Sequence, residues 1–257
     1  MKRLVSFCGF LSLVLASSAA SFAQSKKVRI AAASDVKFAL DSIIAVFAAQ
    51  SSDNVVVTYG SSGKLFEQIS NGAPFDIFFS ADISYPQKLS ANGLTAMPPE
   101  QYGTGRLVIW SQIADPVREK MESLLNERVR HVSIANPQHA PYGQRAVECM
   151  LYFDIYDKVK TKLVYGENVS QAAQYLYSGA AQAGIIALSL ALSPPMQKLK
   201  GSYYIIPEES HKPLHQGFVI VRGSDKNVAV REFHLFLKSE KVKEIFKFYG
   251  FVVPEND

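Results

Sequence analysis

Short apolar runs alternate with stretches of helical period in the first part of the chain. Each apolar run predicts a buried strand, and the segment after it has apolar positions three and four residues apart, which predicts an amphipathic helix. The strand–helix pairs are expected at 28–32 and 35–50, at 55–59 and 65–70, and at 75–80 and 85–92. Strands that alternate with helices in this way predict an α/β fold built on a parallel sheet.

The same alternation continues through the rest of the chain. Strands are expected at 106–111, 131–135, 162–165, 184–187, 203–207 and 217–222. Helices are expected at 117–126, 144–156, 170–178, 228–238 and 241–249. The sequence has no internal repeat at a solenoid period and no low-complexity segment. The pattern therefore predicts one or two ordinary α/β lobes.

The first residues have the organisation of a secretory signal peptide. Lys2 and Arg3 supply the positive charge, an apolar run covers 4–16, and the small-x-small sequence Ser21-Phe22-Ala23 follows. A membrane-spanning helix needs about 20 consecutive apolar residues, so this run is too short to anchor the protein. We expect residues 1–23 to be removed on export to the periplasm, with no stable membrane insertion.

Cysteine content and charge narrow the class of protein further. Cys8 lies inside the predicted signal peptide, which leaves Cys149 as the single thiol of the exported protein. One thiol forms no internal disulfide, so the fold must be stabilised by its core. The formal net charge of +4 falls to +2 once Lys2 and Arg3 are removed. A charge this small indicates no nucleic-acid partner.

Four polar stretches stand where a predicted strand ends and a helix begins. They are Ala33-Ser34, Gly60-Ser61-Ser62-Gly63, Ala140-Pro141-Tyr142-Gly143 and Asn168-Val169-Ser170. In an open α/β sheet, ligands bind beyond the carboxyl ends of the strands. There the first N–H groups of each helix lack an intrahelical acceptor and carry the positive end of the helix dipole. Neutral donors from four such stretches predict a site for an anion, without a bound metal cation.

Four segments spread over the chain have distinctive sequences: VRIAAASDV, VVVTYGSSGKLFEQISNGAPFDIFFSAD, SIANPQHAPYG and the ending IFKFYGF. They resemble the periplasmic molybdate-binding proteins of the ModA family. The resemblance implies a type II periplasmic-binding-protein fold, in which two doubly wound α/β lobes are joined by two crossovers. The first lobe would comprise 24–104 and 214–257, and the second 105–213. It also implies capture of molybdate, and of tungstate, for delivery to an ABC permease.

The resemblance assigns ligand-binding residues to both lobes. They are Ser34 and Ser62 from the first lobe and Tyr142 and Val169 from the second, Val169 through its main-chain N–H, and the polar stretches add Ala33, Ser61 and Asn168. One branch of the family has a tyrosine where this sequence has Ala187. We therefore expect Tyr142, placed in a turn, to supply the phenolic donor from another direction. We expect a monomer that needs no cofactor and is not an enzyme.

Asp35 is a second departure from the family, which commonly has an uncharged residue there. A carboxylate in the first turn of a helix complements the helix dipole, and this interpretation directs the side chain away from the cleft. In the sharper interpretation, Asp35 accepts a proton from a protonated anion such as hydrogen phosphate. Sulfate or phosphate is accordingly the alternative ligand.

A ferric or transition-metal site is a further alternative. Tyr203 and Tyr204, followed by Glu208, Glu209 and His211, resemble the paired tyrosines of ferric-binding proteins. Neighbouring side chains of a strand point to opposite faces, so an ordinary strand is favoured. The sequence has no G-x-S-x-G elbow and no spacing that implies a catalytic triad.

Overall fold

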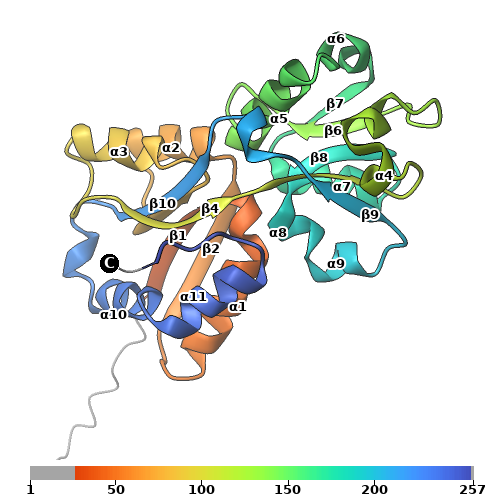
Figure 1. The fold of residues 1–257 in the computed structure, drawn as a ribbon. Helices are drawn as coiled ribbons and strands as arrows, with labels where there is room; N and C mark the ends of the chain where they lie inside the picture. Colours follow the sequence, from red (N-terminus) through yellow and green to blue (C-terminus); the bar gives the residue numbers. More distant parts are fainter. Residues whose placement is uncertain (1–26, 256–257) are drawn as a thin grey trace, which may run out of the picture.

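The computed structural model of the protein describes residues 27–255. The predicted signal peptide, residues 1–23, lies outside the described residues. The chain forms two α/β lobes, and each is built around its own five-stranded sheet (Figure 1). The first lobe contains the beginning and the end of the described chain, and the second contains its middle.

The sheet of the first lobe has the strand order β2-β1-β3-β10-β4. Its strands are β1 (Lys27–Ala33), β2 (Asn54–Gly60), β3 (Ile77–Ser80), β4 (Glu100–Gly105) and β10 (Leu214–Ile220). The sheet of the second lobe has the order β7-β6-β8-β5-β9. Its strands are β5 (Leu107–Ser111), β6 (Val132–Ala135), β7 (Leu163–Gly166), β8 (Ala183–Ala187) and β9 (Ser202–Ile205).

Helices accompany both sheets. In the first lobe they are the 3-10 turn η1 (Ser34–Val36), α1 (Lys37–Ala48), α2 (Ser62–Ser70), α3 (Ser84–Ala91), η5 (Ser224–Lys226), α10 (Val228–Leu237) and α11 (Glu240–Phe248). In the second they are α4 (Pro116–Glu119), η2 (Lys120–Leu125), α5 (Pro141–Tyr152), α6 (Tyr156–Val159), η3 (Lys160–Lys162), α7 (Val169–Tyr177), α8 (Leu188–Ala191), α9 (Pro194–Gln197) and η4 (Glu208–Ser210).

The predicted parallel sheet is found only in part, because both sheets are mixed. β1 pairs in parallel with β2 and β3, whereas β10 is antiparallel to β3 and β4. In the second sheet, β5 is antiparallel to β8 and β9. Each of these reversed strands enters its sheet from the other lobe, so it starts at the edge where the neighbouring strands end.

The chain passes between the lobes twice within the described residues. It leaves the first sheet between Gly105 and Leu107 and returns between Ile205 and Leu214. Both passages lie beside each other at the junction of the lobes (Figure 1). The predicted lobe boundaries at 104/105 and 213/214 fall in or next to these passages, and as domain boundaries they stay a prediction.

β1 is a continuous apolar run because both faces of its sheet are covered. Ile30 is buried in one cluster with Ile43 of α1 and Phe233 of α10. Ala31, the next residue, is buried on the opposite face with Leu65 of α2. Alternate side chains of a strand point to opposite faces, so a helix layer on each side needs an apolar residue at every position.

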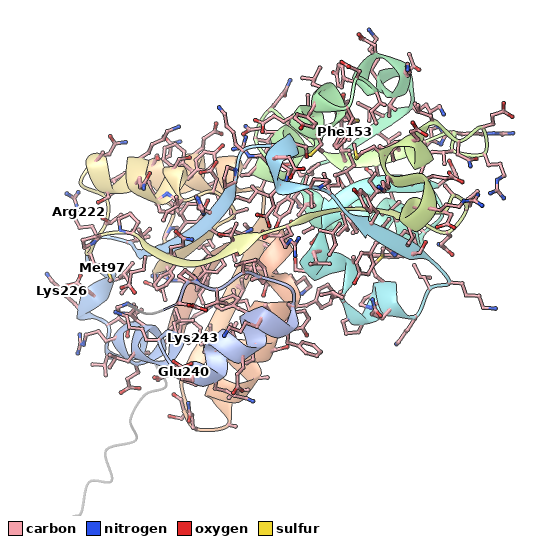
Figure 2. The ribbon with its side chains drawn as sticks, viewed as in Figure 1. Met97, Phe153, Arg222, Lys226, Glu240 and Lys243 are labelled. Atoms are coloured by element: carbon pink, nitrogen blue, oxygen red, sulfur yellow. The ribbon has the colours of Figure 1, made fainter. Side chains whose placement is uncertain are left out.

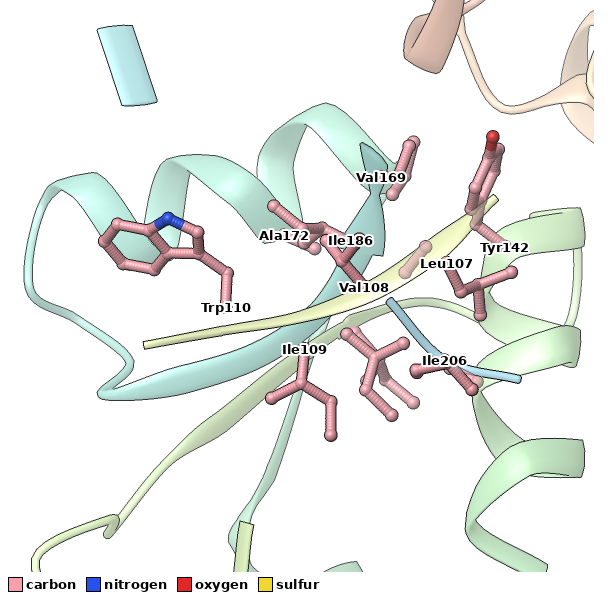
Figure 3. Packing of buried hydrophobic residues seen from close by; sticks show 14 of the residues in the cluster. Leu107, Val108, Ile109, Trp110, Tyr142, Val169, Ala172, Ile186 and Ile206 are labelled. Atoms are coloured by element: carbon pink, nitrogen blue, oxygen red, sulfur yellow. The ribbon is translucent and has the colours of Figure 1, made fainter. Parts of the chain in front are cut away.

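One larger cluster of apolar side chains fills the second lobe. Leu107, Val108 and Ile109 of β5 lie at its centre with Ile186 of β8 (Figure 3). Phe153, at the end of α5, packs against this cluster from outside, whereas Met97 packs against the core of the first lobe (Figure 2). Each lobe therefore has its own core.

Candidate functional site

A small cavity lies between the two lobes and is lined by residues from both. Its volume is about 10 Å³, roughly the space that a single water-sized sphere occupies. The lining residues are Ala33, Ser34, Asp35, Gly60, Ser61, Ser62, Ala81, Ala140, Pro141, Tyr142, Asn168 and Val169. The structure thus brings together all seven residues predicted as ligand candidates. The cavity is therefore small, which excludes a large organic ligand in this closed arrangement.

Strand ends and helix starts place these residues. β1 ends at Ala33, so Ser34 opens η1, and β2 ends at Gly60, so Ser62 opens α2. In the second lobe, α5 begins at Pro141, a residue that suits the first helical position because its missing N–H has no intrahelical acceptor there. The prediction that Tyr142 lies in a turn is wrong, because it belongs to the first turn of α5.

The start of α7 offers one backbone N–H to the cavity. Asn168 is the N-cap, and its Oδ1 accepts from the N–H of Gln171 at 3.1 Å. The N–H of Ser170 donates to Ser34 Oγ at 3.2 Å. The N–H of Val169 also belongs to this first turn, where no intrahelical acceptor exists. Val169 lines the cavity. The N–H groups of Ser170 and Gln171 already donate to side chains, so the Val169 N–H is the donor of this turn that a ligand could accept from.

Two serine hydroxyls of the first lobe are held by backbone amides. Ser34 Oγ accepts the N–H of Ser170 from across the cavity, and Ser62 Oγ accepts the N–H of Ala81 at 3.0 Å. A hydroxyl that accepts a hydrogen bond from a fixed donor still has its own hydrogen to donate. Both serines are therefore positioned as donors.

Tyr142 is part of a buried polar network behind the cavity. The Tyr102 hydroxyl donates to Gln216 Oε1 at 2.6 Å, which fixes the orientation of this amide. Gln216 Nε2 then donates to the Tyr142 hydroxyl at 3.0 Å and to Asp35 Oδ2 at 2.8 Å. The Tyr142 ring stands at the edge of the apolar cluster with its hydroxyl pointing away from it (Figure 3). Burial raises the pKa of Tyr142 well above 10, so the hydroxyl keeps its proton.

Asp35 is among the residues that line the cavity, and the direction of its side chain relative to the cleft stays a prediction. The residue is buried, its Oδ2 accepts from Gln216 Nε2, and the Tyr142 hydroxyl also interacts with the carboxylate. Burial raises the pKa of Asp35 from 3.8 to about 6, and the donors near the carboxylate, including those of Gln216 and Tyr142, lower it in part. The hydrogen bond from Gln216, which lies 181 residues later in the chain, holds the Asp35 carboxylate in its orientation.

No lysine, arginine or histidine is among the described residues that line the cavity. His139 lies just behind the lining, where Nδ1 is 2.9 Å from Ser61 Oγ. Arg145 of α5 is buried but forms ion pairs with Asp82 and Glu148. Neutral donors suit a site that is empty part of the time, because a buried cation without its partner is costly.

Contacts between the lobes surround the cavity. Ser170 Oγ donates to the Ser34 carbonyl at 2.8 Å, and Ser189 Oγ donates to the Asp35 carbonyl at 2.7 Å. The N–H of Gly63 donates to the His139 carbonyl at 2.9 Å. These bonds join α2 and η1 of the first lobe to the second, so the lobes are closed on each other.

Sequence comparison assigns the chain to a family. Residues 28–252 match the model of a bacterial extracellular solute-binding protein family. The molybdate-binding protein ModA of Rhodobacter capsulatus is 34% identical over 247 residues, which cover 95% of each chain. The chain belongs to the ModA family of solute-binding proteins.

Other ModA proteins have the same extent and fold. The molybdate-binding protein ModA of Azotobacter vinelandii is 33% identical over 230 residues, which cover 89% of this chain and 91% of that one. The solved structure of the periplasmic molybdate-binding protein from Azotobacter vinelandii matches with a TM-score of 0.82 at 32% identity, over 89% of this chain and 100% of that chain. The predicted ModA resemblance and the two-lobed periplasmic-binding-protein fold are confirmed.

Some residues of the site escaped the sequence-based prediction. Gly60, Ala140 and Pro141 belong to the predicted polar stretches but were not named as ligand candidates. Ala81 follows β3 and orients Ser62. Gln216 lies inside β10, where one polar residue within a strand gives no signal of its role. Gln216 is in register with Gly103 of β4, and the pairing of β10 with β3 and β4 brings it behind the cavity.

The tyrosines of the ferric alternative lie elsewhere. Tyr203 and Tyr204 belong to β9, where they pair with Trp110 and Ile109 of β5 and pack against the second core. Within 27–255, no group of three or more His, Cys, Asp or Glu side chains is arranged to hold a metal ion. The helices of the same range include none long and apolar enough to cross a membrane.

Proposed function

We propose that the chain is exported to the periplasm, captures molybdate in the cavity between its lobes and presents the closed complex to an ABC permease. Ser34, Ser62, Tyr142 and the N–H of Val169 are the proposed donors to the anion. Ala33, Ser61 and Asn168 complete the lining. Tungstate carries the same charge and shape and is expected to bind as well. Binding requires no catalytic step.

The observation that supports this proposal best is the state of the three hydroxyls. Ser34, Ser62 and Tyr142 each accept a hydrogen bond from within the protein. Ser34 and Ser62 each have a hydrogen left for an oxyanion that can only accept, and Tyr142 can turn its hydrogen from the Asp35 carboxylate to the anion. A hydrogen bond to a charged group contributes about 1.5–3 kcal/mol net, so three hydroxyls and one amide suffice for tight binding after the costs of association.

Closure of the lobes follows from the distribution of the donors. Ser34 and Ser62 belong to the first lobe, and Tyr142 and Val169 to the second. An anion held by one lobe gains the remaining donors only when the lobes close, so it binds the closed state more tightly than the open state. Such differential affinity shifts the population toward the closed state, which the permease would recognise.

One observation favours a second candidate ligand. A buried carboxylate, Asp35, is among the cavity-lining residues, and hydrogen phosphate has a proton to donate to a carboxylate, whereas molybdate and sulfate have none at neutral pH. A phosphate-binding protein of the same fold is therefore the alternative. Sulfate is smaller than molybdate, so its oxygens would lie too far from some of the donors to accept good hydrogen bonds.

The ligand is identified by a competition titration. We expect molybdate and tungstate to displace each other with similar affinity, and sulfate and phosphate to compete at least about 100-fold more weakly. Isothermal titration calorimetry on anion-free protein measures each dissociation constant. Tighter binding of phosphate or sulfate than of molybdate would overturn the choice of ligand.

Tyr142→Phe tests the phenolic donor. The variant removes one hydrogen bond to a charged group, which corresponds to about a 10- to 100-fold loss of molybdate affinity. Tyr165→Phe is the matched control, because Tyr165 is exposed on β7 and does not line the cavity. Equal molybdate affinity of Tyr142→Phe and wild type would show that Tyr142 does not contact the anion.

A further inference from the structure

We propose that His139 is a positioning residue of the anion site, which holds the two lobes closed through Ser61 and so delays release of the bound anion. The pair His139–Ser61 is called the latch below. This inference deepens the proposed function and rests on it, because the latch acts on the same cleft and on release of the same anion.

His139 contacts the opposite lobe with both its side chain and its main chain. It lies in the second lobe, just before α5. Its Nδ1 is 2.9 Å from Ser61 Oγ, and its carbonyl accepts the N–H of Gly63 at 2.9 Å. Ser61 and Gly63 belong to the start of α2 in the first lobe. One residue of the second lobe therefore binds two groups of a single helix turn of the first.

Ser61 is the N-cap of α2, but its hydroxyl is not used as a cap. A serine at this position normally accepts an N–H from the first turn of its own helix. Within α2, which the structure describes in full, the Ser61 side chain makes no capping hydrogen bond. Its hydroxyl binds His139 instead, and the His139 carbonyl takes the N–H of Gly63, one of those that the serine could cap. His139 thus replaces the missing cap, and it can do so only while the lobes are closed.

Opening of the cleft would exchange these partners. Both bonds between α2 and His139 must break when the lobes separate. Ser61 is then free to cap the first turn of α2, whose N–H groups have no intrahelical acceptor. The new cap replaces part of what is lost, so the latch delays opening without preventing it. A protein that must give up its ligand needs a contact of this kind.

The latch is shielded from water, unlike the ion pair beside it. Ser61 is 3% exposed and the His139 side chain 14%. His139 Nε2 is 3.7 Å from Glu167 Oε2, and Glu167 pairs with Lys64 of α2 at 2.6 Å, where both side chains are about half exposed. Exposed ion pairs contribute little because water competes with them. The bond between His139 and Ser61 is therefore the part of this contact that we expect to hold the lobes.

The latch should affect release of the anion and not its capture. The anion enters an open cleft, where His139 and Ser61 are apart, and it leaves only after the closed cleft opens. Loss of a contact made only in the closed state therefore speeds dissociation. For His139→Ala we expect dissociation of molybdate to be about 3- to 10-fold faster, with an association rate within about twofold of wild type. A chase of labelled molybdate with excess unlabelled molybdate measures dissociation, and calorimetry gives the dissociation constant from which association follows.

Conservative variants test which nitrogen acts. The amide of asparagine can place a polar atom near the position of Nδ1, so His139→Asn should keep the slow release of wild type. The amide of glutamine reaches toward the position of Nε2, so His139→Gln should release molybdate as fast as His139→Ala. His215→Ala is the matched control, because His215 Nδ1 lies 3.1 Å from the Thr104 hydroxyl within the first lobe. It should leave both rates unchanged.

A double-variant cycle and the binding of wild type separate the outcomes. In a Ser61→Ala background, His139→Ala should change dissociation less than about twofold. A wild-type dissociation rate in His139→Ala would overturn the latch alone, and so would a full effect of His139→Ala without the Ser61 hydroxyl. The comparison of His139→Asn with His139→Gln decides even if His139→Ala folds poorly. Failure of wild type to bind molybdate would overturn the proposed function, and this inference with it.

Discussion

Gly63→Ala should lower the affinity for molybdate by about 100-fold without destabilising the empty protein. A Cβ on Gly63 would lie 2.6 Å from the His139 carbonyl oxygen and 3.1 Å from His139 Cα. Both are backbone atoms of the other lobe, so only an opening of the cleft relieves the clash. Overpacking costs about 1–3 kcal/mol, and loss of the hydrogen bond from the Gly63 N–H to His139 adds about 1 kcal/mol. Calorimetry with molybdate measures the loss.

Stability distinguishes blocked closure from misfolding. Gly63 lies in the first turn of α2, and alanine favours a helix over glycine by up to about 1 kcal/mol. The anion-free variant should therefore melt at or above the temperature of wild type. Lys64→Ala is the control, because it removes an ion pair with Glu167 across the cleft in which both side chains are about half exposed. Such a pair contributes at most about 1 kcal/mol, so molybdate affinity should fall less than about fivefold. Wild-type affinity in Gly63→Ala would contradict closure on the anion as described.

The apolar pattern was sufficient to predict the lobes but not the direction of every strand. The run at 28–32 identifies β1 because a strand covered on both faces must be apolar throughout. β4 has the sequence EQYGTG, with two glycines and little alternation, and no strand was predicted there. Its partner is β10, which lies more than 100 residues later, so its extended conformation is imposed by tertiary pairing.

The site was predictable where it depends on local structure. Ser34, Ser62 and Val169 stand at helix starts, and a helix start presents donors whatever surrounds it. The orientation of the Asp35 carboxylate could not be predicted, because the helix dipole alone is satisfied in several orientations. Its actual direction depends on Gln216, and local sequence contains no information about a contact between residues so far apart in the chain.

In the absence of an anion, Asp35→Asn should gain stability relative to wild type as the pH rises. The pKa of Asp35 is raised from 3.8 to about 6 in the folded protein, so the folded state holds this proton more tightly than the unfolded state. The contribution to stability is fully present below pH 3.8 and is lost as the pH rises through 6. The change amounts to about 3 kcal/mol. Asparagine does not titrate, and its amide oxygen can still accept from Gln216.

Thermal unfolding of anion-free protein from pH 4 to pH 8 checks this difference. Relative to wild type, the melting temperature of Asp35→Asn should rise by about 6–12 °C over this range. Asp41→Asn changes a partly exposed carboxylate that Lys37 and the Tyr59 hydroxyl contact, and its stability should vary with pH as that of wild type does. Melting temperatures of Asp35→Asn and wild type that stay parallel would mean that the buried carboxylate is already compensated. A rising difference would show that the empty site retains an ionised group at a cost in stability.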